Sequence, residues 1–135
     1  MPQPTEPDLL AAFNHFSSDI RSHLLALREL IFKTATSING CGEVVESLKW
    51  GQPSYATINP ESGTPLRLGA PKSAPGCYAL YVPCQTNLIE SIRLIYPDEF
   101  RFEGNRALII DPRTPCSPDA ISHCLEMALM YHMKR

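Results

Sequence analysis

Two aromatic rings and a side-chain amide lie close together in the stretch Trp50–Tyr55. Aromatic faces beside an amide are a usual lining of small-ligand pockets, so this segment predicts ligand contacts from Trp50, Gln52 and Tyr55. A structural alternative stays open. The glycine and the proline in the same stretch can turn the backbone through a corner, and the two aromatic rings would then fill the core.

Three cations further along the chain, Arg67, Lys72 and Arg106, are candidates for holding a phosphate or a carboxylate. Cationic side chains that converge bind such anions through charge-assisted hydrogen bonds. Arg106 follows a Gly-Asn turn that would hold its position, and Tyr81 ends a strand-like run that would place its ring alongside. The alternative is that the cations are separate and solvated, as scattered surface cations usually are.

Cys84 is the candidate nucleophile, because a helix is expected to begin near Asn87 and a helix N-terminus favours the thiolate. No histidine lies nearby in the sequence to act as its base, so an enzyme is not the leading interpretation. The five cysteines form no C-x-x-C pair, and the histidines and cysteines lack the spacing of a zinc site. We therefore predict reduced thiols and no metal ligands among these residues.

The charge balance excludes a general nucleic-acid binder. The 135 residues contain 12 Lys and Arg against 14 Asp and Glu, a net charge of -2, so no excess positive field attracts nucleic acid or an anionic membrane. The longest apolar runs are far shorter than the roughly 18 residues that span a bilayer, and the acidic, proline-rich start does not resemble a secretory signal. We predict a cytoplasmic protein that contacts neither nucleic acid nor membrane.

Apolar residues recur at helical spacing near both ends of the chain, whereas the centre alternates turn residues with short β-type runs. Ser17 and its neighbours can cap a second helix within the N-terminal stripe, so we predict two helices there. Asn87 with Glu90 indicates a capping box for a third helix, and Ser117 followed by proline indicates a fourth. The expected strands are Ser54–Ile58, Pro65–Gly69, Cys77–Val82, Phe100–Phe102 and Ala107–Ile110.

These elements predict an α+β fold in the order ααβββαββα, with an antiparallel sheet of about five strands and helices packed on one face. Residues 1–135 contain no repeat or long linker, which indicates a single domain. The proline-rich residues 1–7 are expected to form a flexible N-terminal tail.

Six groups of residues resemble, in the same order along the chain, those of the YdhG-like family, a bacterial domain of unknown function. They are Leu27–Ile31, Lys49–Tyr55, Gly63–Gly69, Tyr78–Val82, Phe102–Ala107 and Ala128–His132. The resemblance implies a small α+β fold. Some members of this family are frataxin-like proteins that bind iron and deliver it to iron–sulfur or haem assembly.

Three hypotheses for the function follow, of which the third is an enzyme that uses Cys84 as its nucleophile. The first is a non-enzymatic module that binds a small ligand or a protein partner through the Trp50–Tyr55 corner, with Arg67, Lys72, Tyr81 and Arg106 alongside, and without a cofactor. The second, implied by the resemblance alone, is a frataxin-like intracellular iron-binding protein. The ligand, the pathway and the oligomeric state do not follow from the sequence.

Overall fold

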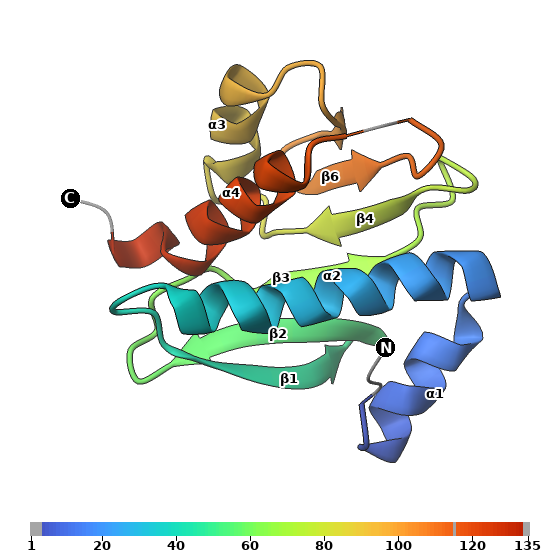
Figure 1. Cartoon of the computed structure of the whole chain (residues 1–135), viewed down its shortest axis with the longest axis horizontal. Helices are drawn as coiled ribbons and strands as arrows, with labels where there is room; N and C mark the ends of the chain where they lie inside the picture. Colours follow the sequence, from blue (N-terminus) through green and yellow to red (C-terminus); the bar gives the residue numbers. More distant parts are fainter. Residues whose placement is uncertain (1–3, 115, 134–135) are drawn as a thin grey trace.

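The computed structural model describes residues 4–114 and 116–133. Its strands form one antiparallel sheet in the spatial order β1-β2-β3-β4-β6-β5 (Figure 1). The strands are β1 (Glu43–Lys49), β2 (Gln52–Ile58), β3 (Leu66–Gly69), β4 (Tyr78–Tyr81), β5 (Arg101–Glu103) and β6 (Ala107–Ile110). The helices are α1 (Pro7–His15), α2 (Ser18–Ser37), α3 (Leu88–Ile95) and α4 (Pro118–Leu129), and a 3-10 turn follows at Tyr131–Met133.

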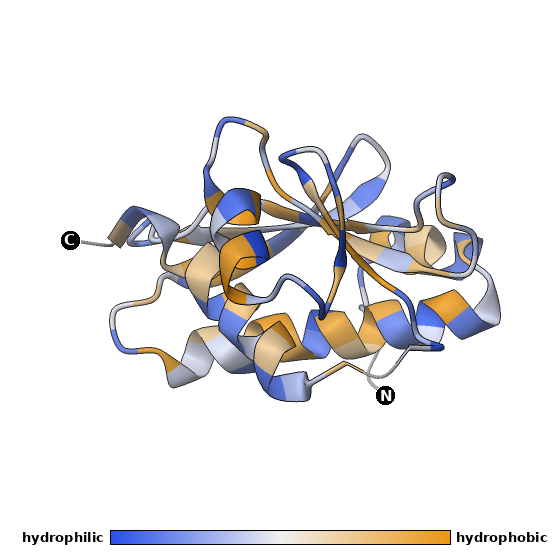
Figure 2. Cartoon of the chain, turned by 90° about the horizontal axis from the view of Figure 1, so that it is seen from above, coloured by the Kyte–Doolittle hydropathy of each residue, from blue (hydrophilic) through white to orange (hydrophobic). Residues whose placement is uncertain are grey.

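The predicted α+β fold with helices on one face of an antiparallel sheet is confirmed, with one additional strand. Helices α2 and α4 pack against each other and against the sheet, and loops project from its other side (Figure 2). Helix α1 packs beside β1 and β2. Among the described residues, no helix combines the length and the apolar character needed to cross a membrane.

The strand that the sequence analysis missed, β1, carries a glutamate among its inward residues. Val44, Glu46 and Leu48 alternate on the helix side of the sheet, and Glu46 is paired there with Arg28 of α2. A charged residue at an inward position breaks the apolar alternation that indicates a strand. Its partner lies 18 residues earlier in the chain, so the pattern becomes intelligible only in the folded molecule.

The helix starts follow the expected capping chemistry in two of four cases. The side chains of Ser17 and Ser117 accept hydrogen bonds from backbone N–H groups at the starts of α2 and α4. Helix α1 is capped by the side chain of Glu6, which accepts hydrogen bonds from the backbone N–H groups of Asp8 and Leu9. The capping box predicted at Asn87 is wrong, because its side chain makes no capping bond and the Thr86 hydroxyl accepts from the first N–H of α3 instead.

The N-terminal segment is partly described. Residues 1–3 of the expected tail lie outside the described residues. In the described part, Pro4 is buried and α1 already begins at Pro7. Proline suits this first helical position because its fixed backbone angle is helical and its missing N–H is not needed there.

The core lies between the helices and one face of the sheet. Leu24 and Ile31 of α2 and Leu66 and Leu68 of β3 are fully buried there. A second, smaller cluster lies on the opposite face, where the loop between β3 and β4 covers β4 and β6. That cluster contains Ala74, Cys77, Ala79, Ala107 and Ile109, with Tyr81 packed against it. The part of this face formed by β1, β2 and β3 has no such cluster among the described residues, and we call this part, together with Tyr81 at its border on β4, the open face.

Candidate functional site

The open face presents Arg67 of β3 directly opposite Tyr81 of β4. Successive side chains of a strand point to opposite faces, and Leu66 and Leu68 are buried against the helices, so Arg67 and Gly69 must face the other way. Tyr81 shares this face, because its neighbour Leu80 belongs to the main core. Both Arg67 and Tyr81 are half-buried.

Gly69 allows Gln52 to come close to Tyr81. A Cβ atom at Gly69 would lie 2.9 Å from Nε2 of Gln52 and 3.0 Å from Cε2 of Tyr81. Any larger residue at this position would therefore need one of the two side chains to move. The bare backbone of Gly69 leaves room for an amide and a phenol ring to lie side by side on the open face.

The charge of Arg106 acts on the same phenol. Burial raises the pKa of the Tyr81 hydroxyl, and so does the negative charge of Glu103, whereas the charges of Arg106 and Arg67 lower it. Two guanidinium groups from separate strand regions thus lie within electrostatic reach of one hydroxyl. We refer to Gln52, Arg67, Gly69, Tyr81 and Arg106 as the open-face cluster.

Within the described residues, neither guanidinium group of this cluster has a carboxylate partner. Within residues 4–114 and 116–133, the ion pairs closer than 4.0 Å involve Arg28, Arg101 and Arg113 only. Glu103, the nearby carboxylate, accepts a hydrogen bond from the Ser73 hydroxyl. Unpaired arginines beside a hydroxyl and an amide suit an anion with oxygen acceptors.

A groove joins the cluster to α1. It has a volume of about 410 Å³ and lies between Asp8, Ala11, Ala12, His15 and Phe16 on one side and Gly51, Gln52, Gly69 and Ala70 on the other. Gln52 and Gly69 belong to both the groove and the cluster. A ligand larger than a simple anion therefore has space to extend from the cluster towards α1.

The other predicted site residues are separated from this cluster. Tyr55 is 1% exposed, points to the helix side and donates a hydrogen bond to Glu46. Trp50 is 90% exposed in the two-residue turn between β1 and β2. The alternative in which both rings fill the core is therefore right for Tyr55 and wrong for Trp50. Lys72 is exposed in the loop between β3 and β4, and no contact joins it to the cluster among the described residues.

The structure gives Cys84 no catalytic partner in the described part of the chain. Its side chain is exposed, and all five cysteines are free thiols. Within that same part, no group of three or more His, Cys, Asp and Glu residues is arranged to hold a metal ion.

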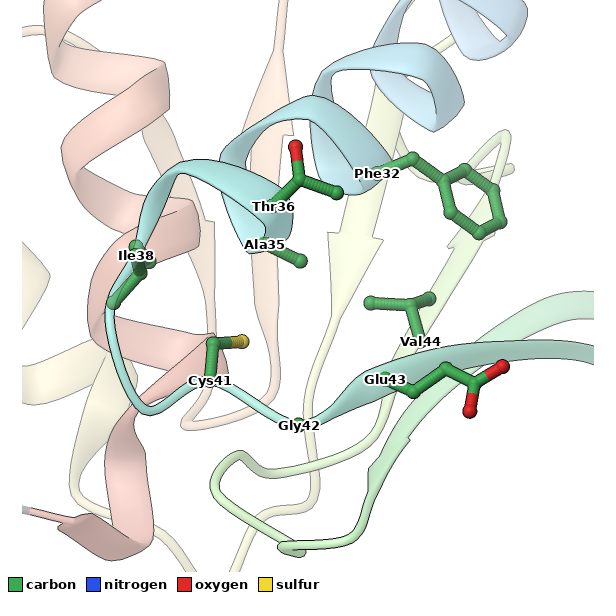
Figure 3. Close-up of a pocket in the computed structure, with 8 residues that line it drawn as sticks. All are labelled: Phe32, Ala35, Thr36, Ile38, Cys41, Gly42, Glu43 and Val44. Carbon is green, nitrogen blue, oxygen red and sulfur yellow. The ribbon is translucent and has the colours of Figure 1, made fainter.

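A larger hollow, which the sequence analysis did not anticipate, lies between the C-terminal half of α2 and the start of β1. It measures about 630 Å³. Val44 and Ala35 point into it, whereas the Glu43 carboxylate points away (Figure 3). Its lining residues are Phe32, Ala35, Thr36, Ile38, Cys41, Gly42, Glu43 and Val44. Recognising β1 as a strand in the sequence would have pointed to this hollow, because the N-terminal half of β1 forms one of its walls.

Comparisons with models of known protein families, with curated proteins and with solved structures find no match to this chain. The resemblance to the YdhG-like family stays a prediction. The function is therefore inferred from the geometry of the molecule.

Proposed function

We propose that this protein is a non-enzymatic binding module of the YdhG-like kind that holds a small organic anion, a phosphate or carboxylate compound, on its open face. Arg67 and Arg106 contact the anionic oxygens, and Tyr81 and Gln52 supply directional hydrogen bonds. The observation that carries this proposal is that Arg67 lies opposite Tyr81 in the sheet, and that the charges of Arg67 and Arg106, both without a carboxylate partner among the described residues, act on the Tyr81 hydroxyl. The five free thiols support a reducing compartment, the cytoplasm.

The geometry favours binding over catalysis. A flat strand pair holds Arg67 and Tyr81 in register, so the ligand meets groups that are already positioned. The adjoining groove gives selectivity for compounds that carry a further segment beside the anion. Within residues 4–114 and 116–133, no hydrogen bond joins a side chain of the cluster to the side chain of a histidine or a cysteine.

The test is a thermal-shift and calorimetric panel of inorganic phosphate, organic phosphates and carboxylates under reducing conditions. At a ligand concentration about a hundred times its dissociation constant, the native state gains about 2.7 kcal/mol, which raises the melting temperature by several degrees. We expect Arg67→Ala and Arg106→Ala to abolish this rise. Lys33→Ala, which removes one charge from the exposed side of α2, is the matched control and should retain it.

Two outcomes would overturn the proposal. The first is a stabilising anion whose effect is unchanged in both arginine variants, since it would bind elsewhere. The second is a panel in which no anion stabilises the protein. If ferrous iron alone raised the melting temperature, the iron-handling alternative would replace anion binding.

A further inference from the structure

In the part of the chain that the structure describes, strand β1 leaves a long edge of the sheet without a strand beside it. It has seven residues and is the first strand of the sheet order, so only its inner side pairs with a neighbour. In Figure 1 no described element runs along the length of its outer side, and α1 contacts β1 near the turn that joins β1 to β2. An edge of this length presents a row of unpaired backbone donors and acceptors, which is a template for another strand.

The opposite edge of the same sheet is protected. Strand β5 has three residues, and Arg101 and Glu103 at its two ends are exposed charges. Short length and charge are the usual means by which proteins prevent strand addition. Strand β1 contains no proline and is more than twice as long, and the exposed charges at its two ends, Glu43 and Lys49, are of opposite sign.

The turn between β1 and β2 determines which backbone groups point outward. Trp50 and Gly51 both have positive φ, 54° and 76°, as in the two-residue turns that close a hairpin on a hydrogen-bonded pair. Lys49 and Gln52 form that pair, and the hydrogen-bonded pairs alternate along the ladder. The backbone groups of Val44, Glu46 and Leu48 therefore point to the free edge.

The sequence of this strand is complementary to itself in one antiparallel register. With Glu46 opposite Glu46 of a second copy, all seven residues are paired, and Val44, Glu46 and Leu48 contribute hydrogen-bonded pairs. Glu43 then lies opposite Lys49 of the other copy, in a close pair without backbone hydrogen bonds. Shifting the register by two residues in either direction loses both charge pairs. The central glutamates do not oppose this arrangement, because Arg28 neutralises each of them within its own chain.

The same register covers apolar surface. Val44 and Leu48 are half-buried on the helix side of the edge, and pairing brings Leu48 of the second copy beside Val44, at the mouth of the hollow next to α2. On the open face, Val45, which is 40% exposed, comes to lie opposite Ser47 of the second copy. Charges, backbone groups and apolar side chains thus all favour the same partner.

We infer that β1 is a self-association edge at which two copies of this chain pair antiparallel about Glu46 and form one continuous sheet of twelve strands. This inference goes beyond ligand binding and does not depend on it. No residue of the open-face cluster belongs to β1 itself, so the dimer has two accessible clusters.

A charge-swap series tests the inference by sedimentation equilibrium of the full chain over a range of concentrations. The wild type is expected to be a concentration-dependent dimer. Glu43→Lys and Lys49→Glu each place like charges opposite one another twice per dimer and should raise the dissociation constant about tenfold. The double variant restores opposite charges and should return the dissociation constant to near the wild-type value. Glu90→Lys, an exposed change of the same charge on α3, is the matched control.

Amide hydrogen exchange adds a readout specific to the register. The amides of Val44, Glu46 and Leu48 should become protected as dimer forms, whereas those of Val45 and Ser47 are protected by β2 in monomer and dimer alike. A protein that is monomeric at every concentration would refute the inference and leave the edge to a partner of another kind. A dimer that is indifferent to the single charge changes, or that the double change does not restore, would also refute it.

Discussion

The guanidinium of Arg28 on α2 and the carboxylate of Glu46 on β1 form a two-point ion pair. Nε of Arg28 lies 2.5 Å from Oε2 of Glu46, and Nη2 lies 3.0 Å from Oε1. The Tyr55 hydroxyl donates to the same Oε2 at 2.7 Å, and the hydrogen bond to Glu46 is the main reason that the pKa of Arg28 is raised. One buried carboxylate therefore connects α2, β1 and β2.

Glu46→Gln should lower the free energy of unfolding by about 2 kcal/mol. The amide preserves the size of the side chain but leaves the Arg28 guanidinium, whose side chain is 14% exposed, without a counter-charge. Urea unfolding of the two proteins measures the difference. Glu90→Gln makes the same chemical change at an exposed position in the first turn of α3 and should cost less than about 1 kcal/mol. Equal stabilities for Glu46→Gln and the wild type would show that the pair contributes little.

Acid should remove a stabilising contribution of Asp111. Hydrogen bonds from the Arg113 side chain and backbone, together with one from Arg101, lower the pKa of Asp111 to about 2 in the folded protein. The unfolded value is about 3.9, so this contribution is complete above that pH and is lost as the pH falls towards the folded pKa. Unfolding free energies measured against pH should therefore converge for wild type and Asp111→Asn in acid. Parallel curves would contradict the prediction.

Gly63→Ala should destabilise the protein by about 3 kcal/mol through overpacking. A Cβ atom at Gly63 would lie 2.6 Å from the backbone of Ala128 and Leu129 at the end of α4. The neighbouring Ser62 is also attached to the end of α4, because its hydroxyl donates a hydrogen bond to the Leu129 carbonyl at 2.8 Å. Gly69→Ala is the informative comparison, because its closest neighbour is the end of a movable Gln52 side chain. Thermal unfolding should show a clearly smaller loss of stability for Gly69→Ala than for Gly63→Ala. A larger loss for Gly69→Ala would contradict the close packing of Gly63 against the end of α4.

The thiols should differ in reactivity according to their burial. Cys84 is exposed, whereas Cys77 and Cys124 are each 1% exposed. Burial and the nearby Cys116 raise the pKa of Cys124 to about 12, which suppresses its thiolate. A chromogenic disulfide reagent should therefore titrate a fast thiol that Cys84→Ser removes, and the two buried thiols should react only on unfolding. Fast labelling of Cys124 in the folded protein would contradict this burial.

The fold could be predicted from local patterns wherever apolar periodicity and turn residues agreed. The N-terminal stripe that includes Leu24 and Ile31, and the alternation of Leu66 and Leu68, were sufficient to place helices and strands correctly. Strand β1 could not be found in this way, because Glu46 is acceptable in its inward position only with Arg28 beside it. Trp50 was placed wrongly in one interpretation because a large aromatic ring is usually buried, whereas a tight turn holds this one in solvent.

The candidate site, too, could be predicted only in part from the sequence. The types of its residues, an amide, a phenol and arginines, follow from the sequence, and so does the prediction that they bind an anion. Whether they meet depends on strand register: Arg67 faces Tyr81 only because β3 and β4 pair in one alignment, and Tyr55 is excluded because it lies on the other face of its strand. Side-chain chemistry is a property of each residue, and local periodicity determined most of the helices and strands. Proximity is a property of long-range pairing, which only the tertiary structure decided.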